Sequence, residues 1–168
     1  MKKYLNIFVA VLLSALTVSL ASCSKDDDEP DGGSNNKGVV GELTIDGQKK
    51  SFVYITGETY DDDWGVQYCA TMYTKGWKDV ITFETLVNIA DLSSGMTLTE
   101  DMCVLEPFMA NTLQSGNVHI DKKTKDSITL TFNKAVFKEF NGNRTTTYEG
   151  TIKLPINGEY GDALSSMW

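Results

Sequence analysis

Apolar and polar residues alternate one by one through most of the chain after residue 38, and this period of two constrains the fold more than any other feature. In the clearest block every second residue is apolar: Ile128, Leu130 and Phe132. Because successive side chains of a strand point to opposite faces, such a block predicts a strand with one buried face. Similar blocks recur at short spacing, and no stretch after residue 22 has the period of a helix.

Short strands separated by turn residues predict an all-β fold, either an antiparallel β-sandwich or a flattened β-barrel of about seven to nine strands. Asp46-Gly47 favours a two-residue hairpin turn, and a change of phase at Asn133-Lys134 predicts a β-bulge. Three other segments are expected to be irregular: an acidic loop at 57–63, a charged turn at 122–126 and a tail from 158 onward. The single domain at 38–168 is long enough to bury a core.

The first 22 residues form a targeting segment and not a part of the fold. Lys2 and Lys3 precede an apolar run from Tyr4 to Leu20, and small residues follow it. This order is typical of a secretory signal peptide. One alternative is a transmembrane helix, although the run is at the short end of the roughly 20 residues that a span needs.

The segment ends in Leu20-Ala21-Ser22-Cys23, which resembles the lipobox of bacterial lipoproteins. The resemblance implies cleavage before Cys23 and a diacylglyceryl group on its sulfur, so that the mature chain is anchored to a membrane by lipid. A thiolate is nucleophilic enough for this transfer, and two or three acyl chains anchor a protein stably. The alternative is ordinary cleavage at an A-x-A-like site, which leaves Cys23 as a free thiol.

Residues 23–37 are predicted to be a disordered tether, because they combine acidic residues with Pro and Gly and contain few apolar groups. The start of this tether resembles the export signal that directs Bacteroidota lipoproteins to the outer face of the outer membrane. The resemblance rests on Ser24, Lys25, Asp26, Asp27, Asp28 and Glu29. The alternative is a solvated acidic spacer. We therefore expect the protein in the outer membrane, lipid-anchored and facing the cell exterior.

The strand pattern of the mature chain carries a second resemblance. Residues 115–120, leading into residues 126–132, resemble small uncharacterised surface lipoproteins of Bacteroidota that have an all-β domain. The resemblance implies a fold and a location, and it implies no reaction.

The mature chain is strongly acidic, which excludes two classes of partner. The formal net charge of the chain is -8, and loss of Lys2 and Lys3 with the signal peptide makes it -10. Nucleic acids and anionic lipid surfaces both require a basic patch. The expected partners are the membrane, through the lipid anchor, and either a glycan or an outer-membrane protein.

The chain lacks the residues that most catalytic sites need. His119 is its single histidine and is expected on the polar face of a strand, so zinc patterns that need two or more histidines cannot form, and no serine or cysteine stands in a nucleophile-elbow context to make a triad with it. The sequence has no G-x-S-x-G motif and no glycine-rich phosphate loop. Spacing alone leaves open a pair of distant carboxylates for glycoside hydrolysis. We predict that the protein is not an enzyme and that it uses no cofactor or metal.

The stretch most suggestive of ligand binding is acidic and aromatic: Tyr60, Asp61, Asp62, Asp63 and Trp64. Aromatic faces stack on sugar rings while carboxylates accept their hydroxyl groups, and adjacent aspartates also offer oxygen ligands to calcium. These aspartates do not follow the order of a calcium loop, however. The alternative is that the aromatic residues pack in the core or at an edge. Tyr73 and Trp77 lie at the far end of the same predicted hairpin.

Two candidate modifications, a disulfide and a glycan, complete the set of candidate functional residues. Cys69 and Cys103 are free to form a disulfide in an exported protein, or each is a small buried apolar residue. Asp126-Ser127-Ile128 resembles the O-glycosylation acceptor of Bacteroidota, which implies a glycan on Ser127. The alternative is that Ser127 simply begins a strand.

The sequence therefore supports two hypotheses of different kinds. The first is a non-enzymatic binding module that holds a glycan or another extracellular ligand through loops at one end of the β domain. The alternative is a structural or accessory subunit of an outer-membrane protein assembly, joined through exposed strand edges.

Overall fold

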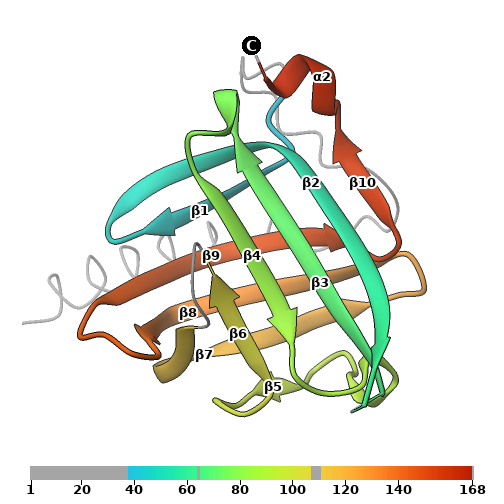
Figure 1. Cartoon of the computed structure of the whole chain (residues 1–168), viewed down its shortest axis with the longest axis vertical. Coiled ribbons are helices and arrows are strands. Elements are labelled where there is room, and N and C mark those ends of the chain that lie inside the picture. The colour runs from blue at the N-terminus through green and yellow to red at the C-terminus, as the bar shows by residue number, and fades with distance from the viewer. Residues whose placement is uncertain (1–37, 64, 107–110, 168) are drawn as a thin grey trace, which may run out of the picture. The chain divides into compact units, whose positions relative to one another are not determined.

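The computed structural model describes residues 38–167, apart from residue 64 and residues 107–110. The predicted signal peptide, the lipid anchor at Cys23 and the acidic tether with its export signal lie outside the described residues. Within them most residues lie in strands, as the alternation predicts (Figure 1).

The strands of the described part are β1 (Gly41–Ile45), β2 (Gln48–Asp62), β3 (Gly65–Thr74), β4 (Val80–Thr85), β5 (Thr97–Leu98), β6 (Cys103–Glu106), β7 (Asn111–Lys123), β8 (Ser127–Glu139), β9 (Thr145–Pro155) and β10 (Gly158–Gly161). The short helical elements are η1 (Lys75–Trp77), η2 (Ile89–Asp91) and the single turn α2 (Ala163–Ser166). The predicted hairpin turn is confirmed, because Asp46 and Gly47 both have positive φ, 49° and 75°.

Eight of these strands close into a barrel. They follow the order β1-β2-β3-β4-β6-β7-β8-β9, and each is antiparallel to the next. The ring closes where β9 pairs with β1, Glu149 opposite Thr44 and Tyr148 opposite Ile45. Of the two predicted architectures the structure shows the barrel, and its eight strands lie within the predicted range. The short strands β5 and β10 are additions beside β7 and β2 (Figure 1).

Inward side chains fill the middle of the barrel. Phe83 and Phe132 meet edge to face with ring centroids 6.4 Å apart, and Tyr148 lies 6.0 Å from Phe132 and 5.6 Å from Phe137. All four rings are buried. Buried aliphatic side chains surround them, among them Leu43, Ile55, Met72, Leu105, Ile120 and Leu130. An eight-stranded barrel is just wide enough for such packing, and in this barrel side chains fill the middle.

Two predictions about the surroundings of β2 are wrong. The expected acidic loop at 57–63 is strand, because β2 continues to Asp62 and pairs with β3. The expected tail contains β10, which pairs with β2 from Gly57 to Tyr54. The alternation of apolar and polar residues did not predict the end of β2, because residues 57–62 are mostly polar or glycine and bury little apolar surface. The predicted bulge is confirmed by the register shift between Phe132 and Ala135.

Candidate functional site

Four chain connections meet at one end of the barrel. Because the strands form an antiparallel meander, alternate connections lie at the same end. The β2–β3 hairpin, the β4–β6 connection with η2, the β7–β8 turn and the β9–β10 turn therefore surround one opening. A cavity of about 670 Å³ lies between them, within the size range of small-molecule sites.

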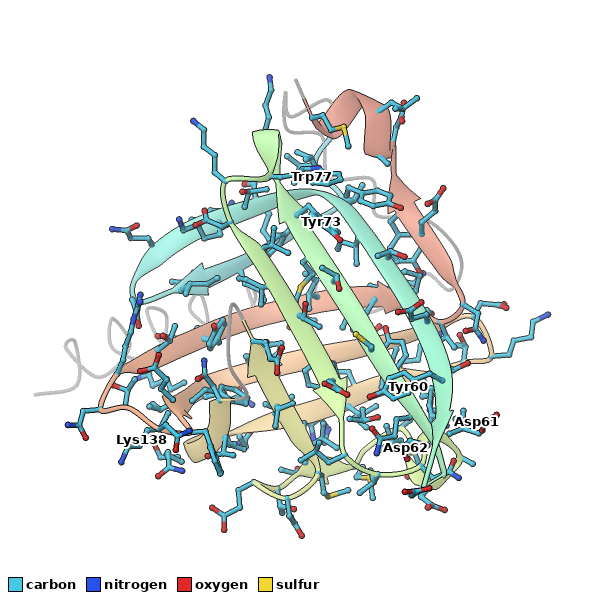
Figure 2. The ribbon with its side chains drawn as sticks, viewed as in Figure 1. Tyr60, Asp61, Asp62, Tyr73, Trp77 and Lys138 are labelled. Atoms are coloured by element: carbon cyan, nitrogen blue, oxygen red, sulfur yellow. The ribbon has the colours of Figure 1, made fainter. Side chains whose placement is uncertain are left out.

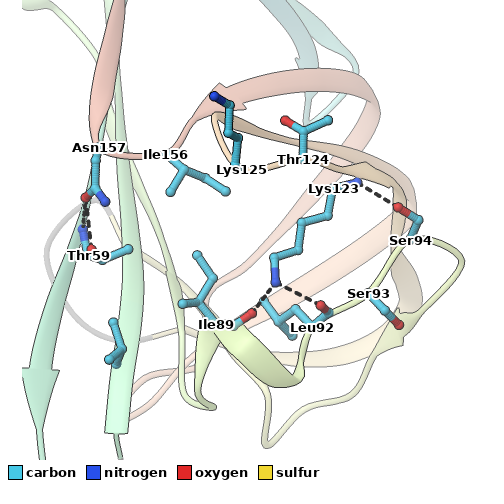
Figure 3. A pocket seen from close by; sticks show the side chains of 11 residues that line it. Thr59, Ile89, Leu92, Ser93, Ser94, Lys123, Thr124, Lys125, Ile156 and Asn157 are labelled. Atoms are coloured by element: carbon cyan, nitrogen blue, oxygen red, sulfur yellow. Dashed lines mark hydrogen bonds between the residues drawn. The ribbon is translucent and has the colours of Figure 1, made fainter.

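This cavity, named the end hollow, is an open depression with mixed walls (Figure 3). Its lining residues are Thr59, Val66, Ile89, Leu92, Ser93, Ser94, Lys123, Thr124, Lys125, Ile156 and Asn157. They supply an apolar surface, hydroxyl and amide groups and two ammonium groups, and none of them carries a carboxylate.

A bulge in β7 turns Lys123 towards the end hollow. β7 and β8 pair Ile120 with Leu130 but Lys122 with Thr129, so one extra residue, Asp121, lies on β7. The alternation then changes phase, and Lys123 pairs with Ile128, which is buried. Bulges re-aim side chains in this way. The expected charged turn at 122–126 is therefore shorter, because β7 continues to Lys123.

The Lys123 ammonium ties the η2 segment to the barrel. Its Nζ donates hydrogen bonds to the carbonyl oxygens of Ile89 and Leu92, the latter at 2.9 Å. Its backbone N–H donates to Ser94 Oγ at 2.8 Å. Figure 3 shows the side chain extended across the hollow to these carbonyl groups. Within the described ranges no carboxylate pairs with Lys123, so neutral carbonyl groups are its partners.

Asn157 forms the opposite wall of the end hollow. Its φ of 52° lies in the left-handed region, which asparagine tolerates better than most residues. Its Oδ1 accepts hydrogen bonds from the backbone N–H and the hydroxyl of Thr59, each at 2.9 Å. These bonds extend the pairing between β10 and β2 by one position and hold the β9–β10 turn against the hairpin.

Tyr60 and Asp62 of the predicted acidic-aromatic site lie on the outer face of the β2–β3 hairpin (Figure 2). Asp61 has the opposite parity on β2: it shares a face with Thr59 and pairs with Val66, and both of these residues line the hollow. The Tyr60 hydroxyl lies 2.9 Å from Gln67 Oε1 and within hydrogen-bond distance of a Glu84 carboxylate oxygen, and its single proton serves these two acceptors. The side chains of Asp61, Asp62 and Asp63 are exposed, and Trp64 lies outside the described residues. The structure thus gives Tyr60 contacts with neighbouring strands, and ligand binding by these five residues stays a prediction.

The outer face next to Tyr60 is acidic. Glu58, Cys69 and Glu84 lie side by side across β2, β3 and β4. Burial raises the pKa of the Glu84 carboxyl above its ordinary value, and the nearby Glu106 raises it further. We regard this face as a set of structural contacts between strands.

A row of three aromatic rings lies at the other end of the same hairpin. The ring centroids of Tyr54 and Tyr73 are 5.5 Å apart, and those of Tyr73 and Trp77 are 4.8 Å apart. The Tyr54 hydroxyl donates to Glu159 at 2.6 Å. Figure 2 shows Tyr73 and Trp77 far from Tyr60 along the strands, so these aromatic groups do not share a site.

The two cysteines are free thiols in the structure, so the candidate disulfide is not formed. Cys69 on β3 and Cys103 on β6 are separated by β4. Two strand spacings are about 10 Å, beyond the roughly 7 Å that a disulfide spans between Cα atoms. Cys103 is a small buried core residue instead, and burial raises the pKa of its thiol to about 12.

The candidate glycosylation residue begins a strand, as its alternative supposed. Ser127 is the first residue of β8, is buried, and has its hydroxyl 3.1 Å from that of Thr124. Attachment of a glycan to Ser127 stays a prediction. The glycan would have to be attached before folding buries this hydroxyl. His119 lies on β7 with Nδ1 3.1 Å from Thr97 Oγ1 on β5.

Among the described residues, no three His, Cys, Asp or Glu side chains are grouped so that they could hold a metal ion. No helix in the described ranges is long and apolar enough to cross a membrane. Comparison of the chain with protein-family models, curated proteins and solved structures finds no match.

Proposed function

We propose that the protein is a lipid-anchored module on the outer face of the outer membrane that binds a glycan or another extracellular ligand and catalyses no reaction. The observation that carries the proposal is the end hollow, a small-molecule-sized depression where four connections meet above a packed core. Binding sites form preferentially at such barrel mouths. The lipobox at Leu20–Cys23 and the acidic residues at 24–29 support the location.

The groups that line the hollow favour binding over catalysis. General acid-base and nucleophilic catalysis need a base within hydrogen-bond reach of the reacting group. The lining residues include no histidine and no carboxylate. The Thr124 hydroxyl accepts from the backbone N–H of Ser127 at 3.0 Å, and Ser94 accepts from Lys123. These hydroxyl groups are therefore engaged in turns, and the lining offers no histidine or carboxylate base to activate them.

The test compares three forms of the lipidated protein extracted from native membranes with mild detergent. Ser93→Trp fills the end hollow with an indole, while Ser115→Trp adds the same side chain at an exposed position of β7 outside it. Each form is screened against a glycan array and a set of small extracellular metabolites. We expect the wild type and Ser115→Trp to bind the same ligand and Ser93→Trp to lose it.

Two results would contradict this site. Binding that survives Ser93→Trp and is lost in Tyr60→Ala would move the ligand to the acidic-aromatic stretch. A wild-type protein that retains nothing from either screen would contradict the binding function itself.

The alternative function, an accessory subunit of an outer-membrane assembly, is favoured by one feature of β7. On the side of β7 away from β8, β6 pairs with residues 111–112 and β5 with residues 118–119. No strand of the described part pairs with residues 113–117 on that side. Exposed strand edges accept partner strands. Co-migration with another outer-membrane protein on native sizing would support this function, and migration alone would contradict it.

A further inference from the structure

We infer that the ligand of the end hollow is a small organic anion, with a carboxylate or sulfate group on a compact and partly apolar body. The inference rests on the proposed function and names the chemical class that the same hollow recognises. Three independent features of the lining lead to it: its charge, its unused hydrogen-bond donors and its apolar surface.

The first feature is the sign of the charge. The chain has 23 acidic and 15 basic residues apart from its one histidine, yet the end hollow is lined by two lysines and no acidic residue. Lys125 is 90% exposed and lies 3.9 Å from Asp126, so its pairing is weak. Lys123 is half-buried and has no carboxylate partner among the described residues. The lining itself is therefore cationic on an acidic protein, although Asp61 pairs with the lining residue Val66 and Asp126 follows Lys125.

The second feature is the balance of hydrogen-bond groups. The main acceptors at the hollow are already used, because Asn157 Oδ1 accepts from Thr59 and the Ile89 and Leu92 carbonyl oxygens accept from Lys123. An ammonium has three donors and an amide nitrogen has two. One Lys123 N–H and the Asn157 NH₂ group therefore have no acceptor in the described part of the chain. Unused donors match a ligand that is rich in acceptors.

The third feature is an apolar surface beside these donors. Val66, Ile89, Leu92 and Ile156 contribute aliphatic side chains to the lining. Leu92 is buried in the main core, and Ile89 and Ile156 pack against it, so this surface is fixed by the fold. A ligand that places an anionic group at Lys123 can rest its carbon skeleton on these side chains. Inorganic anions would leave that surface uncovered.

The test measures dissociation constants by NMR titration on the mature chain from residue 23, with Cys23→Ser so that no lipid or detergent is present. Two matched pairs of probes differ in one group, a carboxylate in place of a CH₂OH group: hexanoate against hexanol, and glucuronate against glucose. We expect at least one anion to bind about tenfold or more tightly than its neutral partner, as a charge-assisted hydrogen bond predicts. The pair that responds distinguishes a fatty-acid-like ligand from an acidic sugar.

Variants of two neighbouring lysines separate charge recognition from structural support. Lys123→Met should weaken binding of the anion about tenfold to a hundredfold and leave its neutral partner unchanged. Lys123→Gln removes the charge but keeps an N–H donor for the η2 carbonyl groups. It should also weaken binding of the anion and leave binding of the neutral partner unchanged. That result would exclude a general loosening of η2 as the cause. Lys122→Met removes an exposed charge from the next position of β7 and should change neither constant by more than about twofold.

Two outcomes would overturn the inference. If the neutral probes bind as tightly as the anions, and Ser93→Trp abolishes both, the binding function stands and anion recognition fails. If neither anion binds measurably while the glycan or metabolite screen finds another ligand at the hollow, the inference fails and the proposed function is retained.

Discussion

Removing the ring of Phe132 is the most direct perturbation of the barrel core. The side chain is 1% exposed and contacts Phe83 edge to face and Tyr148 at a tilt. Truncation of a buried phenylalanine to alanine costs about 3–5 kcal/mol, which includes the cavity that is left. Because both aromatic contacts are lost as well, we expect Phe132→Ala to lower the free energy of unfolding by about 4 kcal/mol.

The assay is urea unfolding followed by far-ultraviolet circular dichroism. With a slope of about 2 kcal/mol per molar urea, a loss of about 4 kcal/mol lowers the midpoint by about 2 M. The matched control is Phe140→Ala, since Phe140 is 72% exposed after the end of β8. An exposed residue without special contacts should change stability by about 0.5 kcal/mol or less.

Equal effects at the two positions would refute the packed interior. So would a loss of less than about 1 kcal/mol in Phe132→Ala, because a ring inside a spacious cavity has few contacts to lose. If Phe132→Ala does not fold at all, Phe132→Leu keeps more of the volume and allows the same comparison with Phe140→Leu.

Three further predictions concern the strand crossings and the outer face. Gly57→Ala would place a Cβ 1.9 Å from the Pro155 carbonyl oxygen, so thermal unfolding should show a loss of about 1–3 kcal/mol, while Gly158→Ala should be nearly neutral. Tyr68→Phe removes the donor to that same buried oxygen, at 2.7 Å, and equilibrium unfolding should show a loss of about 1–3 kcal/mol. Burial raises the pKa of Glu84, so the wild type should lose stability relative to Glu84→Gln as pH rises from about 4.5 through that raised pKa. Unfolding curves at pH 3.5 and pH 7.5 check this, because the stability of the wild type relative to Glu84→Gln should be lower at pH 7.5 than at pH 3.5.

Alternation predicted the strands that bury one face and failed where burial is slight. Ile128, Leu130 and Phe132 are all buried, as the period of two requires. The end of β2 was predicted as a loop because its residues, Gly57 to Asp62, are mostly polar. This part of β2 is a strand because it pairs with β3 and β10. Local composition does not predict pairing between segments that are distant in the sequence.

The sequence alone could not predict the end hollow, for a related reason. Its residues come from four connections, and each connection taken alone is an ordinary turn. Lys123 faces the hollow because the bulge at Asp121 shifts the phase of β7, and the sequence there shows only a run of charged residues. One signal was present, namely three lysines at 122–125 in an acidic chain. This signal became informative once the barrel placed two of them, Lys123 and Lys125, in the lining of the hollow.

The central claim is that the end of the barrel, and not its outer face, holds the ligand. Amide chemical-shift mapping of the mature Cys23→Ser chain with hexanoate and with glucuronate tests it directly. We expect shifts concentrated at Thr59, at residues 89–94 and 123–125 and at Asn157. Shifts centred instead on Tyr60 and its neighbours, or on Tyr73 and Trp77, would contradict it.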